Sequence, residues 1–110
     1  MQRITYNIYM LDCMKSRWFD FIKIEAKPGE IAIGNELSIH VPANENSPSG
    51  IIFMKVQRVR LDLVHDRWGN IVTYAGEAWA KRADIEGNSI VSTQEGMADA
   101  AKRIQAIAQR

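Results

Sequence analysis

The chain has 110 residues, of which 46% are hydrophobic, and its 14 basic and 13 acidic residues leave a net charge of +1. This length predicts a single domain over residues 1–110 that buries a core of its own. The charge balance excludes a global attraction to nucleic acid or membranes, so any such attraction needs a local patch. The single cysteine, Cys13, excludes an internal disulfide and is typical of a reducing compartment.

The first residues do not have the pattern of a signal peptide, because Asn7 and Asp12 interrupt the apolar run, and no apolar stretch is long enough to span a bilayer. We therefore expect a cytoplasmic protein with no membrane partner. The two histidines and the cysteine match no metal-binding spacing, so neither a metal nor another cofactor is predicted.

Two strands are predicted near the N-terminus. Residues 3–11 alternate between apolar and polar from Ile4 to Met10, which is the period of a half-buried strand. Residues 17–26 are dense in aromatic and β-branched side chains and predict a second strand. A helix is the alternative for this second segment, since some of its apolar residues also fall at helical spacing.

A third strand is predicted over residues 30–41, where the apolar positions are odd-numbered throughout. Gly34 and Asn35 interrupt the pattern, so we expect a strand that bends there or two short strands. Residues 42–50 are rich in proline, asparagine and serine, and predict an exposed loop.

The longest strand pattern lies between residues 51 and 81 and predicts a β-hairpin with strands at 51–64 and 70–81. The residues Asp66–Gly69 suit a four-residue turn, because aspartate favours its first position and glycine tolerates a positive φ at its end. A register counted from this turn fixes which residues lie opposite one another.

That register places Leu61 opposite Tyr74 and Val59 opposite Gly76. Its apolar residues share one face because strand side chains alternate with a period of two. We expect this face to be buried, and it carries Val59, Leu61, Leu63, Val72 and Tyr74.

The hairpin changes phase within its first strand, since one apolar alternation runs through Ile52, Met54 and Val56 and the next, of opposite parity, through Val59, Leu61 and Leu63. A period of two changes phase only where an extra residue is inserted, so a β-bulge with a strong bend is predicted at Gln57–Arg58. Trp79 then points to the polar face of the hairpin, beside Lys55. A large aromatic side chain on a polar face is unusual.

A C-terminal helix is predicted over residues 93–108. Ser92 and Glu95 have the spacing of a capping box, and Asp99 and Arg103 form a favourable i,i+4 pair. One stripe of this helix is apolar and suits packing on a sheet or on a partner helix: Met97, Ala100, Ala101, Ile104, Ile107 and Ala108.

These elements together predict an α+β fold. Five to six antiparallel strands form a bent sheet or a small β-barrel, and one α-helix follows at the C-terminal end. The bulge and the glycine interruption favour the barrel, because a curling sheet requires such irregularities.

No catalytic residues are predicted. General acid–base catalysis needs titratable groups held together in a cleft. The available pairs are His65 with Asp66, which point to opposite faces of a strand, and His40 with Glu36, which lie four residues apart. These spacings are typical of solvated histidines at strand ends, so the sequence favours a protein that is not an enzyme.

A candidate binding surface lies on the polar face of the hairpin and at its turn. Cations interleaved with aromatic rings are typical of single-stranded nucleic-acid platforms, in which cations meet phosphates and rings stack on bases. The candidate residues are Lys55, Arg58, Arg60, Arg67, Trp68, Trp79, Lys81 and Arg82.

A structural role for the same residues is the stronger alternative. Arg58 is expected near Glu77 and Arg60 near Asp62, which would make an ordinary ion-paired strand surface. Trp79 is expected to be covered, by the C-terminal helix or by another subunit, because large exposed apolar groups usually mark contacts with protein.

Three functions follow in order of preference. The first is a non-catalytic interaction or assembly module that contacts a protein partner or forms a homo-oligomer, through the hairpin, the helix or both. The second is single-stranded nucleic-acid binding through Lys55, Arg58, Arg60 and Trp79. The third is a small enzyme with a pocket that the sequence does not reveal.

Overall fold

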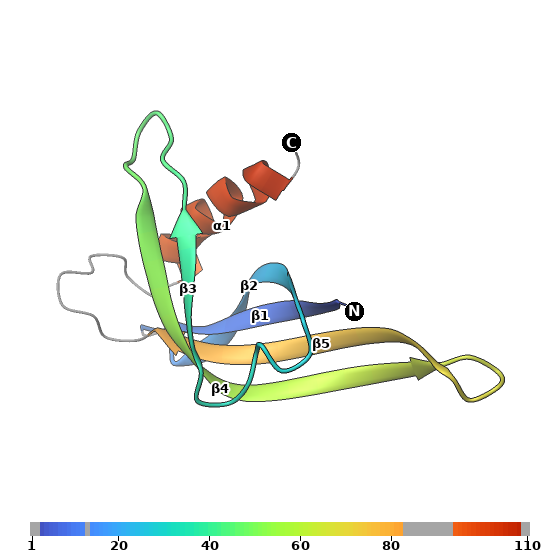
Figure 1. Ribbon diagram of the computed structural model, residues 1–110. Coiled ribbons are helices and arrows are strands. Elements are labelled where there is room, and N and C mark those ends of the chain that lie inside the picture. The colour runs from blue at the N-terminus through green and yellow to red at the C-terminus, as the bar shows by residue number, and fades with distance from the viewer. Residues whose placement is uncertain (1–2, 13, 83–93, 109–110) are drawn as a thin grey trace.

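The computed structural model describes residues 3–12, 14–82 and 94–108 (Figure 1). Its elements are the strands β1 (Ile4–Asp12), β2 (Arg17–Ala26), β3 (Glu36–Val41), β4 (Gly50–His65) and β5 (Ile71–Arg82), followed by the helix α1 (Gln94–Ala108). The predicted α+β class is confirmed. Among the described residues, no helix has both the length and the apolar character needed to cross a membrane.

The five strands form one curled sheet, a half-barrel, in the order β2-β1-β5-β4-β3. Three of the neighbouring pairs are antiparallel, but β1 and β5 run parallel, so the prediction of a wholly antiparallel sheet was wrong for this pair. Because three other strands separate β1 from β5 along the chain, no tight turn dictates their relative direction.

The predicted bulge in the hairpin is confirmed, since the pairing of β4 with β5 shifts between Val56 and Arg58. Figure 1 shows the consequence: β4 descends from the loop at the top, bends sharply and continues to the right as part of a long ribbon. The first part of β4 pairs with β3 through residues 50–55, and the second part pairs with β5 alone.

The third strand is shorter than predicted, because it begins at Glu36 and not near residue 30. Gly34 adopts a φ of 89°, and its N–H donates to the Val56 carbonyl oxygen over 2.9 Å. Asn35 accepts the Val56 N–H in return. Residues 27–35 are therefore turns that end against the edge of β4, and Ile33 in this segment is 68% exposed.

The core lies on the concave side of the half-barrel and is closed by α1, which contacts the two edge strands β2 and β3. Met97 and Ala100 of the helix are buried in this core as the apolar stripe predicts, whereas Ile107 is exposed. All five strands contribute to the buried set, which includes Ile4, Tyr6, Ile8, Met10, Phe19, Phe21, Ile22, Val41, Ile52, Met54, Val56, Ala78 and Ala80.

The N-terminus of α1 is held by Asp12, a buried carboxylate at the end of β1. Its Oδ2 accepts the N–H of Gln94 over 2.9 Å, and its Oδ1 accepts the N–H groups of Met14 and Lys15. Asp12 therefore caps the helix from a distant strand. The predicted capping box involves Ser92, which lies outside the described residues; Glu95 forms an ion pair with Lys15 at 2.8 Å.

The other half of α1 is tied to the loop between β3 and β4. One Nη of Arg103 donates to the carbonyl oxygens of Pro42 and Pro48, at 2.9 and 3.1 Å. The predicted pair with Asp99 is also present, at 3.1 Å. The helix is thus fixed to both ends of the half-barrel, which keeps its apolar stripe over the open side of the sheet.

We predict that Asp12→Asn weakens the fold and changes its response to acid. The N–H of Gln94, and then those of Lys15 and Met14, hold the pKa of Asp12 below its ordinary value. A carboxylate with a lowered pKa in the folded state stabilises the fold above about pH 4, and this stabilisation is lost as the pH falls further. Thermal unfolding followed by circular dichroism should show a lower melting temperature at pH 7 and a shallower loss of stability on acidification.

Glu95→Gln is the matched control, because Glu95 is an exposed acid at the same end of the helix. Its pair with Lys15 is open to solvent and contributes little. If the two variants behave alike at neutral pH, Asp12 is not the group that anchors the helix.

Candidate functional site

The far end of the hairpin projects from the half-barrel as a two-stranded ribbon, seen at the right of Figure 1. The neighbouring strands stop before it: β1 reaches β5 only as far as the pair Thr5–Ala75, and β3 reaches β4 only as far as Glu36–Lys55. We call residues 61–74 the hairpin arm. Its residues have no third strand and no helix beside them among the described residues.

The hairpin arm exposes an unusual amount of apolar surface. Leu61, Leu63, Val64 and Ile71 are 41–48% exposed, and Trp68 is 72% exposed. The prediction that Leu61 and Leu63 are buried was therefore wrong. They do lie on the face that continues the core, but the core ends where the ring of Tyr6 covers Gly76, and no strand or helix of the described residues covers the arm beyond that point.

The predicted register was also wrong, by two residues: Leu61 lies opposite Gly76, and Val59 lies opposite Ala78. The turn accounts for one residue of the shift, since His65 lies opposite Ile71 and not Asn70, and an irregularity between Val64 and His65 inserts the other. An even shift keeps Leu61 and Leu63 on their predicted face.

The turn is where the sequence predicts it, with Gly69 at a φ of 84°. Asp66 holds it, since its Oδ1 accepts the N–H groups of Trp68 and Asn70. The guanidinium of Arg67 lies 4.4 Å from the centre of the Trp68 ring. Arg67 and Trp68 therefore form a pair at the tip of the hairpin arm, away from the other candidate residues.

Trp79 points to the convex face, as predicted, and stands between two cross-strand neighbours. Its ring stacks on Tyr9 of β1, with ring centres 5.4 Å apart and planes 17° from parallel. On the β4 side the guanidinium of Arg58 lies 4.6 Å from the ring centre. Neighbouring strands thus form a row of three stacked groups, which we call the Tyr9–Trp79–Arg58 stack.

The expectation that α1 covers Trp79 was wrong, because α1 packs on the concave side, where Ala78 and Ala80 are buried. The covering groups come from the adjacent strands instead. Both faces of the indole are occupied, so only its edge meets solvent, and a base could stack on it only if Arg58 moved away.

The remaining cations of the candidate surface divide into two groups. Lys55 lies opposite Lys81, and the two form a positive pair at one end of the convex face. Arg60 contacts Glu77 and also lies 3.6 Å from Asp62, so its charge is neutralised within the chain. Glu77 was predicted beside Arg58, and its partner is Arg60.

Arg82 lies opposite the buried Met54, so its position belongs to the concave side of the sheet. The other candidates of the hairpin strands lie on the convex side. The structure thus brings together Lys55, Lys81, Arg58 and Trp79, with Arg60 one pair further along.

Tyr9 was missed by reasoning from sequence, although its outward parity in the first strand was visible. Its hydroxyl accepts a hydrogen bond from the Asn7 side-chain amide at 2.8 Å. Burial, and then a hydrogen bond with Glu77, raise the pKa of this hydroxyl above its ordinary value, so it stays protonated at neutral pH. No sequence signal places Tyr9 beside Trp79, because the parallel pairing of β1 with β5 is not encoded in either strand.

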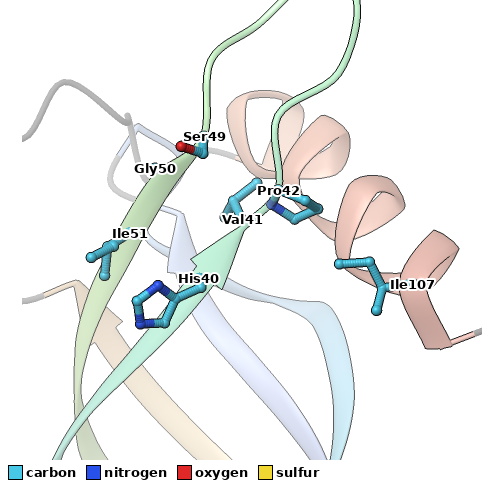
Figure 2. A pocket seen from close by; sticks show the side chains of 7 residues that line it. All are labelled: His40, Val41, Pro42, Ser49, Gly50, Ile51 and Ile107. Carbon is cyan, nitrogen blue, oxygen red and sulfur yellow. The ribbon is translucent and has the colours of Figure 1, made fainter.

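The surface cavities are lined by few titratable side chains. One of about 460 Å³ lies where β3 and β4 enter their loop; Figure 2 shows His40 and Ile51 on the strands and Ile107 on the helix opposite. A second, of about 450 Å³, is lined by Asp20 and Lys23. Among the described residues, no three His, Cys, Asp or Glu side chains gather in a way that could hold a metal ion.

The acid–base pairs considered from the sequence do not meet in these cavities. Asp66 is occupied by the backbone of the turn, and His40 and Glu36 lie about 13 Å apart along β3 at the usual rise of a strand. Comparison of the chain with protein-family models, curated proteins and solved structures finds no match to any of them.

We predict that Trp79→Ala lowers the free energy of unfolding by about 2 kcal/mol, because it removes a half-buried ring and both of its stacking contacts. Trp79→Phe should recover part of this loss. Urea denaturation followed by circular dichroism measures both. Trp68→Ala is the matched control, since that ring is at the exposed tip; an equal loss in this variant would contradict a structural role for the Tyr9–Trp79–Arg58 stack.

Proposed function

We propose that this protein is a small non-catalytic interaction module that docks onto another protein surface through the hairpin arm, in the cytoplasm, as its single cysteine suggests. The observation that supports the proposal most directly is the exposed apolar surface of the arm. Five large apolar side chains, at 41% to 72% exposure, lie within eleven residues of sequence: Leu61, Leu63, Val64, Trp68 and Ile71.

The physical argument is that such a ribbon is poorly stabilised alone. Two-stranded hairpins are marginal in water, because each strand has only one neighbour and no apolar layer covers the pair. Leu61 and Leu63 lie on one face of the ribbon, and exposed apolar groups that cluster on a folded protein usually mark a contact site. A partner that packs against Leu61 and Leu63 would give these side chains apolar neighbours that the arm lacks.

Single-stranded nucleic-acid binding, the alternative, has weaker support. It rests on the neighbouring lysines Lys55 and Lys81, which place two positive charges opposite one another on the sheet, and Glu36 of β3 lies opposite Lys55 on its other side. Against it, Arg60 is already paired with carboxylates and Trp79 offers no free face. Catalysis has no comparable support from the cavities described above.

The proposal predicts that Leu63→Asp reduces association by at least about tenfold, because it places a charge in the middle of the apolar contact. The purified wild-type protein and the variant are compared by light scattering over a wide concentration range and by affinity purification from the source cells. A wild-type protein that stays monomeric at every concentration and retains no partner would contradict the proposal.

Ile107→Asp is the matched control, since Ile107 is an exposed isoleucine, 55% exposed, on the helix. The arm proposal requires that it associates as the wild type does. Loss of association in the helix variant alone would identify α1, and not the arm, as the docking surface. An oligonucleotide titration at low salt, repeated with Lys55→Glu, tests the nucleic-acid alternative, because phosphate contacts weaken steeply as salt rises.

A further inference from the structure

We propose that the docking partner of the hairpin arm is a second copy of this chain, joined through the free edge of β4 in an antiparallel pairing centred on Leu61. This inference rests on the proposed function, because it assigns the occupant of the same arm. It follows from three features of β4: where its free edge begins and ends, the direction of its backbone groups, and the order of its charges.

The free edge of β4 runs from Gln57 to His65. At one end, both backbone groups of Val56 are bonded to the turn, through Gly34 and Asn35. At the other end the strand stops at His65. No backbone hydrogen bond from the described residues reaches this edge between those limits. Over these nine residues β4 pairs with β5 on one side only, so its other edge is a ready template for another strand.

The backbone groups of this edge point outward at alternate residues. Those of Val56 point away from β5, since they bond to the turn. The bulge inserts one residue, so the alternation places the outward groups at Val59, Leu61 and Leu63. These three residues carry the apolar side chains of the arm face, and their backbone groups are the ones available to a partner.

Two-fold symmetry restricts how two such edges pair. An antiparallel pairing related by a two-fold axis keeps the same face of both sheets on one side, so the numbers of two opposed residues add to an even sum. The midpoint of the free edge, 57 to 65, is Leu61. Pairing about that midpoint uses the whole edge and places Val59 opposite Leu63 of the second copy.

The charges favour this same centre. Pairing about Leu61 places Arg60 opposite Asp62 of the second copy, twice by symmetry. Centres at Arg60 or Asp62 would each oppose like charges on the axis, and a centre at Val59 would oppose Arg58 with Arg60. Opposite charges across strands stabilise a sheet, and like charges destabilise it.

Asp62 is available for this contact, because its separation from Arg60 in its own chain is 3.6 Å, longer than a good hydrogen bond, and both side chains are 53% exposed. Arg60 also contacts Glu77 of its own chain, so in the dimer its guanidinium would be shared between Glu77 and Asp62 of the second copy. The predicted assembly joins the two half-barrels into one continuous sheet across the two arms. A single strand pairing buries less than the roughly 800 Å² per partner of a standard interface, so we expect a dissociation constant on the order of micromolar.

The test is disulfide formation at the axis. In full-length protein with Cys13→Ser, Leu61→Cys should oxidise to a covalent dimer, since opposed residues at the centre are about 5.5 Å apart between Cα atoms, within disulfide range. Leu63→Cys is the matched control: it has the same exposure, 47% against 46%, and the same face. It should stay monomeric, because its two copies would be about 14 Å apart.

A mixture of Val59→Cys and Leu63→Cys proteins should form the mixed dimer and neither self-dimer in quantity. Non-reducing gel electrophoresis and mass spectrometry distinguish these products. Equal oxidation of the Leu61→Cys and Leu63→Cys proteins would indicate random collision and overturn the register. Absence of any covalent dimer at concentrations up to the millimolar range would overturn pairing with a second copy.

Charge variants give a second measurement that does not depend on cysteine chemistry. Arg60→Asp and Asp62→Arg should each dimerise at least about tenfold more weakly than the wild type in sedimentation equilibrium, and an equimolar mixture of the two should dimerise again. Failure of the mixture to recover would overturn the register.

The two proposals fail in different ways. Suppose that the wild-type protein is a monomer, that the Leu61→Cys protein forms no covalent dimer, and that Leu63→Asp still abolishes capture of a different protein. The arm then docks as proposed, but not on its own copy. If Leu63→Asp has no effect on any association, the proposed function itself is wrong.

Discussion

One inserted residue in β4 sets the form of the whole molecule. The bulge between Val56 and Arg58 bends the strand, so its first part closes the half-barrel with β3 and its second part leaves the core with β5. It also exchanges the faces of the strand, because a period of two cannot pass an extra residue unchanged. Without that exchange, the side chains of the arm would present their charges to the concave side.

The same bulge organises the convex face. Arg58 directly follows the inserted residue and lies opposite Trp79, which in turn lies beside Tyr9 on the parallel strand β1. Side chains on neighbouring strands stand nearly perpendicular to the sheet, so three large planar groups in one cross-strand row stack face to face. Tyr9 and Arg58 cover the two faces of the Trp79 indole. The cations and aromatic ring that suggest a binding platform in the sequence are therefore packed against one another in the structure.

Local sequence patterns predicted the strands and the helix well. They did not predict which distant strands pair or which distant residue caps the helix. The alternation of Ile4 to Met10 and the phase change near Gln57 are properties of a few neighbouring residues, and the strands and the bulge follow from them. The parallel contact of β1 with β5, and the cap that Asp12 provides for Gln94, join residues about 70 to 80 positions apart, for which a single sequence carries no signal. The wrong register had a local cause, a turn that pairs His65 with Ile71 and a second bulge beside it.

The burial of Leu61 and Leu63 was the most informative error. Alternation states which face a side chain occupies, but it does not state that the same chain covers that face. Here the apolar parity of the core continues along β4 after Tyr6 and Gly76 have ended the core itself. A chain that continues its core pattern beyond its own core exposes surface that is unfavourable in water. We propose that a second molecule packs beside these residues, and the order Arg60-Leu61-Asp62 on an open strand edge makes a copy of the same strand a matching partner.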